Sequence, residues 1–213
     1  MLTLYQFEGS PYSWKVRIAL TEKGLPFQAV TPQNRDANPE FRRLSPTGKV
    51  PVLVTEEGTA IVESTIINEY LDERYPERPL LPANPAARAQ ARMVEEIADQ
   101  YLAPALRMML LSRARMEAGR WHRRSDPSPA QEAEGLRTAT PYLDHLDRLA
   151  RGREYFQNVF GMADIGLIPV LGRTGRALEL PLAARWSGLH AWLTRCLARP
   201  SVTKTAPPPL QFV

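Results

Sequence analysis

Short apolar segments alternate with helical patterns over the first 78 residues of the chain. Between Ser13 and Lys23 the apolar positions recur every three or four residues, as one face of a helix requires, and Gly24 follows as a stop signal. Segments rich in β-branched and aromatic residues are shorter and are bounded by turn residues, which predicts strands. The patterns predict strands over 1–7, 27–31, 50–54 and 59–62 and helices over 13–23, 38–44 and 63–74. This order is typical of a small α/β domain with a parallel pair of strands, a hairpin and a covering helix.

The pattern changes after residue 75, where four prolines fall within ten residues and indicate a linker. Beyond them the apolar positions keep a helical period and no segment alternates with period two, so the rest of the chain is predicted to be helical. Helices are expected over 86–117, 131–150, 162–172 and 182–198, with Pro104 as a kink in the first of them. The sequence therefore predicts an α/β domain over 1–78, a linker over 79–87 and an all-helical domain over 88–213.

The composition, 44% apolar and 23% charged over 213 residues, is that of an ordinary globular protein. The single cysteine, Cys196, excludes an internal disulfide and a zinc site with two thiolates, and the three histidines lie far apart, so we expect no metal site. The N-terminus shows no basic segment followed by an apolar core, and no run approaches ~18 apolar residues, so we expect a cytoplasmic protein without a membrane partner. Acidic residues are interspersed with the arginines that supply most of the net charge of +4, which argues against nucleic acid as a partner.

Three short motifs follow one another in the first domain: SPYS at 10–13, GKVPVL at 48–53 and ES at 63–64. They belong to the runs SPYSWKVRIALTEKGLPF, NPEFRRLSPTGKVPVL and IVESTIINEYLDERYP, which together resemble the thioredoxin-like domain of cytosolic glutathione transferases. Two later runs, NVFGMADIGLIPVL and LARPSV, are similar to segments of the helical domain of that family. The resemblance covers most of the chain, and it implies a thioredoxin-like domain followed by an all-α domain, glutathione as co-substrate and a homodimer.

The first motif carries the candidate catalytic residue, Ser10. A free thiol has a pKa near ~8.5, so glutathione must lose a proton before its sulfur can attack an electrophile. A hydroxyl at a helix N-terminus donates a hydrogen bond to the thiolate, and the exposed N–H groups and helix dipole add to this effect. The resemblance implies that Ser10 takes the role of the active-site serine of the tau-like and zeta-like classes. Two other hydroxyls could take this role: Tyr5, because other classes use a tyrosine near the end of this strand, and Ser13. Alternatively, Ser10 only caps the helix.

The other two motifs are expected to hold the peptide. The resemblance implies that Val50 offers its backbone N–H and C=O to the cysteinyl part of glutathione, next to a cis bond at Pro51. Glu63 and Ser64 match the pair that holds the γ-glutamyl end, since a helix N-terminus binds a carboxylate and a carboxylate pairs with an ammonium group. A plain helix cap by Ser64 is the alternative. The cation for the glycine carboxylate is left open among three residues: Lys49, Arg35 and Arg42.

The electrophile is expected between the first helix and the second domain. Tyr12 and Trp14 would contribute from the first helix, and Arg107 would contribute from a helix over 103–121, because it lies beside an apolar stripe. A solvated basic face is the alternative for the arginines of that helix. In the same domain, Gly161 and Asp164 match the capping box at the start of a family helix, which is a folding element.

The resemblance implies a serine-type glutathione transferase that adds or substitutes the glutathione thiolate on a small electrophile. One alternative is a zeta-like isomerase of an unsaturated dicarboxylate, although Pro11 and Tyr12 stand where that class has serine and cysteine. A second alternative is a transferase-like regulatory protein that binds polymerase, similar to the stringent-starvation family. Retention of Ser10, Glu63 and Ser64 favours a working thiol site over the regulatory alternative.

Overall fold

The computed structural model describes residues 1–33, 38–117 and 120–210. The chain forms two compact units. The first contains Met1–Leu81 together with Pro200–Pro208, and the second consists mainly of Pro82–Arg199. The sequence division at 79–87 did not include a C-terminal segment in the first unit, because nothing local in residues 200–208 indicates which domain they join.

The first unit is built on a four-stranded mixed sheet with the order β2-β1-β3-β4. Its strands are β1 (Leu2–Tyr5), β2 (Phe27–Val30), β3 (Val52–Val54) and β4 (Ala60–Val62). Strand β1 pairs parallel with β2 and antiparallel with β3, and β3 and β4 form an antiparallel hairpin. The predicted parallel pair and hairpin are therefore confirmed.

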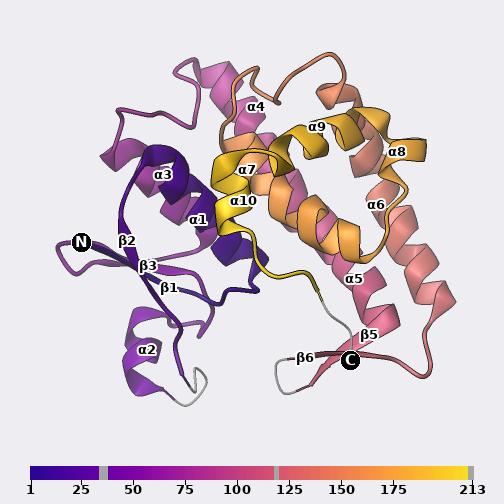
Figure 1. Ribbon diagram of the computed structural model, residues 1–213, viewed down its shortest axis with the longest axis horizontal. Helices are drawn as coiled ribbons and strands as arrows, with labels where there is room; N and C mark the ends of the chain where they lie inside the picture. The colour runs from indigo at the N-terminus through magenta and orange to yellow at the C-terminus, as the bar shows by residue number, and fades with distance from the viewer. Residues whose placement is uncertain (34–37, 118–119, 211–213) are drawn as a thin grey trace. The chain divides into compact units, whose positions relative to one another are not determined.

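The helices of the first unit are α1 (Pro11–Lys23), α2 (Pro39–Leu44), α3 (Ser64–Arg74) and α10 (Pro200–Thr205). Helices α1 and α3 lie side by side on one face of the sheet, and α2 lies on the other side (Figure 1). Polar contacts hold the pair at both ends: the Lys15 ammonium donates to Thr65 Oγ1 at 2.8 Å, and Lys23 forms a buried ion pair with Asp72 at 2.8 Å. The apolar core lies between these helices and the sheet, and it includes Leu4, Ile18, Leu53, Ile67 and Leu71.

The second unit is mainly helical. Its helical segments are α4 (Pro85–Glu96), η2 (Ile97–Leu102), α5 (Ala103–Arg113), α6 (Pro129–Ala150), α7 (Met162–Pro169), η3 (Val170–Gly175), α8 (Leu182–Arg185) and α9 (Ser187–Leu197). Helices α4 and α5 run on through η2, a π-helical turn, into one long helix (Figure 1). Pro104 follows this turn, and because proline has no N–H to donate, the regular i→i−4 pattern is interrupted there. The kink predicted at Pro104 stays a prediction.

A β-hairpin follows the long helix, which corrects the prediction of helix up to residue 117 and across 103–121. Helix α5 ends at Arg113, and the strands β5 (Ala114–Glu117) and β6 (Arg120–Arg123) pair antiparallel, with Arg115 opposite His122. Each strand has four residues, which is too short for a period-two pattern to stand out against the helical period before it. The expectation that no strand follows residue 85 was therefore wrong.

The predicted capping box at the start of α7 is confirmed. The carboxylate of Asp164 accepts from the backbone N–H of Gly161 at 3.0 Å. It also accepts from the Phe156 N–H at 3.2 Å and from the Trp192 indole N–H at 2.7 Å, so one buried carboxylate joins α7, the preceding loop and α9. In the part of the chain that the structure describes, we find no helix with the length and hydrophobicity needed to cross a bilayer.

Candidate active site

The register of the sheet brings the three sequence motifs to one end of it. Tyr5 at the end of β1 is the partner of Val52, and Val52 is in turn the partner of Val62 at the end of β4. The segments next to these three positions therefore lie at the same end of the sheet. They are the loop 6–10 that leads to Ser10, the dipeptide 50–51 that enters β3, and the dipeptide 63–64 that opens α3.

Ser10 is the N-cap of α1. Its Oγ accepts from the backbone N–H of Ser13 at 3.2 Å, and its carbonyl accepts from Trp14 at 3.0 Å. The side chain is half-buried. Since a hydroxyl has one proton and two lone pairs, capping occupies one acceptor position and leaves the proton to donate. The capping role and a hydrogen bond to a thiolate are therefore compatible.

The two rivals of Ser10 are placed differently. Ser13 is fully buried, and its hydroxyl has no hydrogen-bond partner among the described residues. A ligand sulfur would have to enter the core to reach it. Tyr5 is half-buried in β1, and its ring packs against Phe41 of α2 with 5.9 Å between the centroids. Burial thus argues against Ser13, whereas Ser10 and Tyr5 are both partly accessible.

The second motif has the backbone that the resemblance implies. The Val50–Pro51 bond is cis, as expected from the family and not from the residues alone. Before it, the Lys49 carbonyl accepts from Ser45 Oγ at 2.8 Å, which ties this turn to the end of α2. Val50 is half-buried and Pro51 is buried.

Glu63 has an unusual backbone conformation at the start of α3. Its φ of 68° lies in the left-handed region, although it is not a glycine. Such a conformation costs on the order of 1–3 kcal/mol, and residues that adopt it cluster at active sites and ligand-binding segments. Glu63 is exposed, and Ser64 is buried as the first residue of α3. The exposed carboxylate therefore stands next to the N–H groups of a helix N-terminus, where an ammonium and a carboxylate of one ligand can both be bound.

Cations lie next to the second motif. Lys49 is exposed, and the guanidinium of Arg42 lies so close to Gly48 that a Cβ there would stand 2.7 Å from Arg42 Cζ. Gly48 has a φ of 67°, so the turn requires glycine for its backbone and for this contact. The third candidate cation, Arg35, lies outside the described residues.

The residues predicted to line an electrophile pocket differ in exposure. Tyr12 is 39% exposed in the first turn of α1, whereas Trp14 is 2% exposed and donates its indole N–H to Thr205 Oγ1 at 3.1 Å. Trp14 is thus buried and hydrogen-bonded inside the first unit, and little of its surface is accessible to a substrate. Arg107 is exposed on α5 in the second unit.

Sequence reasoning missed Arg17, one helical turn after Trp14. Its guanidinium is buried and donates to Gln6 Oε1 and to the Glu8 carbonyl at 3.0 Å, both in the loop before Ser10. It also donates to the Thr205 carbonyl of α10, from Nε at 3.2 Å and from Nη2 at 3.0 Å. The available signal was a basic residue within the apolar stretch 14–20 of α1, but Lys15 shares this feature and the partners of Arg17 are not local in sequence.

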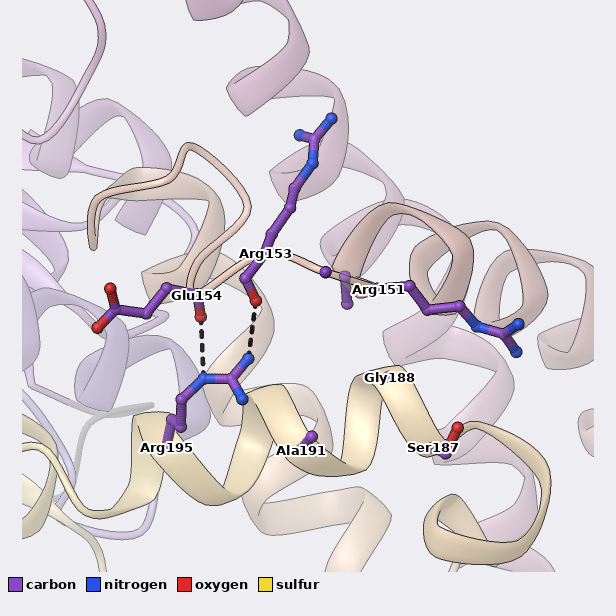
Figure 2. Close-up of a pocket in the computed structure, with 9 residues that line it drawn as sticks. Arg151, Arg153, Glu154, Ser187, Gly188, Ala191 and Arg195 are labelled. Carbon is purple, nitrogen blue, oxygen red and sulfur yellow. Dashed lines mark hydrogen bonds between the residues drawn. The ribbon is translucent and has the colours of Figure 1, made fainter.

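A separate cavity of about 500 Å³ lies in the second unit, between the segment 150–154 and α9 (Figure 2). Its arginines are held by other groups: Arg151 pairs with Asp147, and Arg195 donates to the carbonyls of Arg153 and Glu154. None of the predicted site residues lines this cavity, so it is not the candidate active site.

Comparison with known proteins identifies the family to which this fold belongs. The family description "Glutathione S-transferase, N-terminal domain" matches residues 4–79, and "Glutathione S-transferase, C-terminal domain" matches residues 129–195. Glutathione S-transferase U19 of Arabidopsis thaliana is 30% identical over 212 residues, which cover 97% of this chain and 90% of that protein. The chain therefore belongs to the glutathione S-transferase family.

Two further proteins illustrate the range of relatives. A glutathione S-transferase from Methylobacterium radiotolerans, solved in complex with glutathione sulfonate, superposes with a TM-score of 0.79 at 32% identity and covers 100% of this chain and 97% of its own. Maleylacetoacetate isomerase of Pseudomonas aeruginosa is 42% identical over 99 residues, or 44% of this chain, and the match spans 46% of that protein's length. The predicted family and the predicted thioredoxin-like plus helical architecture are thus confirmed.

Proposed function

We propose that this chain is a serine-type glutathione transferase that acts on a small electrophile. The observation that carries the proposal is the position of Ser10, which caps α1 at the end of the sheet where 50–51 and 63–64 also lie. In the reaction the thiol proton passes to water, and Ser10 donates a hydrogen bond to the remaining thiolate. The sulfur electron pair then forms the new carbon–sulfur bond. In a substitution the leaving group departs with its bonding electrons, and in an addition the displaced pair takes up a proton from water.

Glutathione would be bound by the surrounding backbone and charges. Val50, beside Pro51, supplies a backbone N–H and C=O to the cysteinyl part, as an added strand does. Glu63 pairs with the α-ammonium of the γ-glutamyl end, and Ser64 with the α3 N-terminus binds its carboxylate. Lys49, supported by Arg42, binds the glycine carboxylate through charge.

Replacement of the two candidate hydroxyls tests the catalytic role. Ser10→Ala is expected to bind glutathione normally but to lose on the order of 10²-fold in turnover, because one hydrogen bond to the developing charge is removed. Tyr5→Phe is the matched control, since it also removes a single hydroxyl from the same unit, and it should keep the wild-type rate. Steady-state conjugation rates and glutathione affinity measured on both variants decide the question. Normal turnover in Ser10→Ala together with an inactive Tyr5→Phe would assign the role to Tyr5.

A zeta-like isomerase is a second candidate, because the relative with 42% identity over 99 residues is a maleylacetoacetate isomerase. The residues after Ser10 oppose it, since Pro11 and Tyr12 replace the serine and cysteine of that class. An assay of cis–trans isomerisation of an unsaturated dicarboxylate with catalytic glutathione separates the two activities. Failure to bind to immobilised glutathione would instead favour the regulatory alternative.

The remaining predictions made from the sequence are part of this proposal. Tyr12 and Arg107 are proposed to contact the electrophile. The proposal also includes the domain limits 1–78, 79–87 and 88–213, a homodimer and a role in detoxification. It places the protein in the cytoplasm, where glutathione is the main thiol buffer.

A further inference from the structure

The buried guanidinium of Arg17 connects the loop 6–8 to Thr205, which lies 188 residues after Arg17 in the chain. Arg17 is 6% exposed, and a buried charge is tolerated only when hydrogen bonds replace the lost water. Its donors reach Gln6 and Glu8 on one side and the Thr205 carbonyl on the other. The planar fork of arginine supplies donors in several fixed directions, which a lysine ammonium does not reproduce.

Hydrogen bonds at both ends of the C-terminal helix α10 hold it against α1. At its start, Ser201 Oγ donates to the Glu22 carboxylate. At its end, Thr205 Oγ1 accepts from the Trp14 indole N–H at 3.1 Å and donates to the Ser201 carbonyl at 2.6 Å. A helix of six residues is not stable by itself in water, so the position of α10 depends on these contacts.

The loop that leads to Ser10 needs such support. Between Tyr5 and Ser10 its backbone bonds include Gln6 N–H to the Val30 carbonyl at 2.8 Å and Ser10 N–H to the Phe7 carbonyl at 3.0 Å. Glu8 and Gly9 are exposed, and the Glu8 carbonyl is held by Arg17. Because a displacement of about 1 Å at a catalytic group can cost about 10²-fold in rate, the position of this loop matters for a hydrogen bond to sulfur.

We infer that Arg17 and Thr205 are positioning residues for Ser10, so that the C-terminal helix α10 is a functional part of the thiolate site. Arg17 sets the loop carbonyl two residues before Ser10, and Thr205 with Trp14 sets Arg17. Neither residue touches the sulfur. The inference rests on the proposed function, in which Ser10 stabilises the glutathione thiolate.

The experiment measures the pKa of enzyme-bound glutathione, from thiolate absorbance against pH, together with kcat and KM. Thr205→Val keeps the side-chain shape but removes the hydroxyl that accepts from Trp14, and Arg17→Lys keeps the charge but removes the fork. Both should raise the pKa of the bound thiol by about one unit, which lowers the thiolate fraction about tenfold below that pKa. The KM for glutathione should stay unchanged. Thr203→Val is the matched control, because Thr203 is exposed on the same helix and donates to the Pro200 carbonyl.

Combination with Ser10→Ala separates this inference from the proposed function. If Arg17 and Thr205 act through Ser10, then Thr205→Val in the Ser10→Ala background should cause no further rise in the thiol pKa. A wild-type thiol pKa in folded Thr205→Val, while Ser10→Ala raises it, overturns the inference and leaves the proposed function intact. A wild-type thiol pKa in Ser10→Ala itself overturns both. A purely structural role would lower the melting temperature without moving the thiol pKa of the folded fraction.

Discussion

At the scale of single residues, Asp164 shows how one buried carboxylate organises the helical unit. It is completely buried and accepts hydrogen bonds from Gly161, Phe156 and Trp192. Burial raises the pKa of this carboxyl to about 6, and the three N–H donors act in the opposite direction. The raised pKa means that the folded protein holds a proton that the unfolded chain has already released.

This pKa predicts an unusual pH dependence of stability. Between pH 3.8 and about 6, Asp164 binds more protons in the folded state than in the unfolded state. Protonation of Asp164 therefore adds to the unfolding free energy, and this contribution is complete below pH 3.8 and is lost as the pH rises through about 6. The contribution is on the order of 3 kcal/mol, from about two pKa units at about 1.4 kcal/mol each. Denaturant unfolding of the wild type and of Asp164→Asn, which cannot titrate, should therefore diverge in favour of the wild type as pH falls from 7 to 4.

The Trp192 indole N–H gives a direct check in the unmodified protein. Its NMR resonance, assigned with Trp192→Phe, should titrate with a midpoint near the pKa of about 6, because this N–H donates to the titrating carboxylate. A resonance that stays constant between pH 4 and 7 would contradict the assigned protonation.

Local chemistry decided which residues the sequence could predict. Ser10 and Asp164 were found because a cap and its partner lie within three or four positions, and the cis bond at Pro51 was found because a family motif contains it. Arg17 and Thr205 were not found, since their bonding partners lie 188 residues apart and no short pattern joins them. The charge, the caps and the turn residues are local properties, whereas the contacts of α10 depend on the completed fold.

At the scale of elements, the close approach of α5 and α6 depends on one small residue. Gly135 is buried in α6, and a Cβ at this position would stand 2.5 Å from Met109 Cγ and 2.8 Å from the Ala105 carbonyl oxygen. The second of these atoms belongs to the backbone and cannot turn away. Glycine is therefore required here by space, even though it lowers helix propensity.

Replacement of this glycine should separate the two helices. Gly135→Ala gains about 0.5–1 kcal/mol in helix propensity but meets an overpacking cost of about 1–3 kcal/mol, so we expect net destabilisation. Thermal unfolding should show a melting temperature lower by a few degrees, at about 2–4 °C per kcal/mol for a chain of this size. Thr138→Ala, at an exposed position of the same helix, is the control and should not lower it. A higher melting temperature in Gly135→Ala would show that α5 and α6 move apart without cost.

The strength of a periodic pattern decided which elements were predictable. The long helices were predicted from a clear period, and the short strands β1 to β4 from β-branched and aromatic residues bounded by turn residues. The hairpin β5–β6 was not predicted, because its four-residue strands follow an apolar helix without a proline between them. The π-helical segments η2 and η3 were also not predicted, since a shift of one residue in a hydrogen-bond pattern leaves little trace in apolar spacing.

At the scale of the whole molecule, several large apolar side chains stay exposed on two consecutive helices. Ile66 on α3 is 53% exposed, Met93 on α4 is 55% exposed and Tyr101 on η2 is 48% exposed. Scattered exposed apolar residues are normal, but the last two lie on the long helix whose apolar positions exceed one stripe. Such side chains are the kind that an interface between copies buries.

We therefore predict a two-fold homodimer in which α3 and α4 of each copy contribute to the interface. Light scattering at micromolar concentration should give twice the 24.0 kDa of one chain. An isologous interface of this kind buries at least ~1,000 Å², and each substitution on it acts twice. Ile66→Glu and Met93→Glu place a charge where the apolar side chain is buried by the partner, so either change should shift the mass toward the monomer. Val159→Glu makes the same change in charge at a 68% exposed position outside these helices, and it should leave the dimer intact. A wild-type mass of 24.0 kDa would refute the dimer, and a dimeric Ile66→Glu/Met93→Glu double variant would place its interface elsewhere.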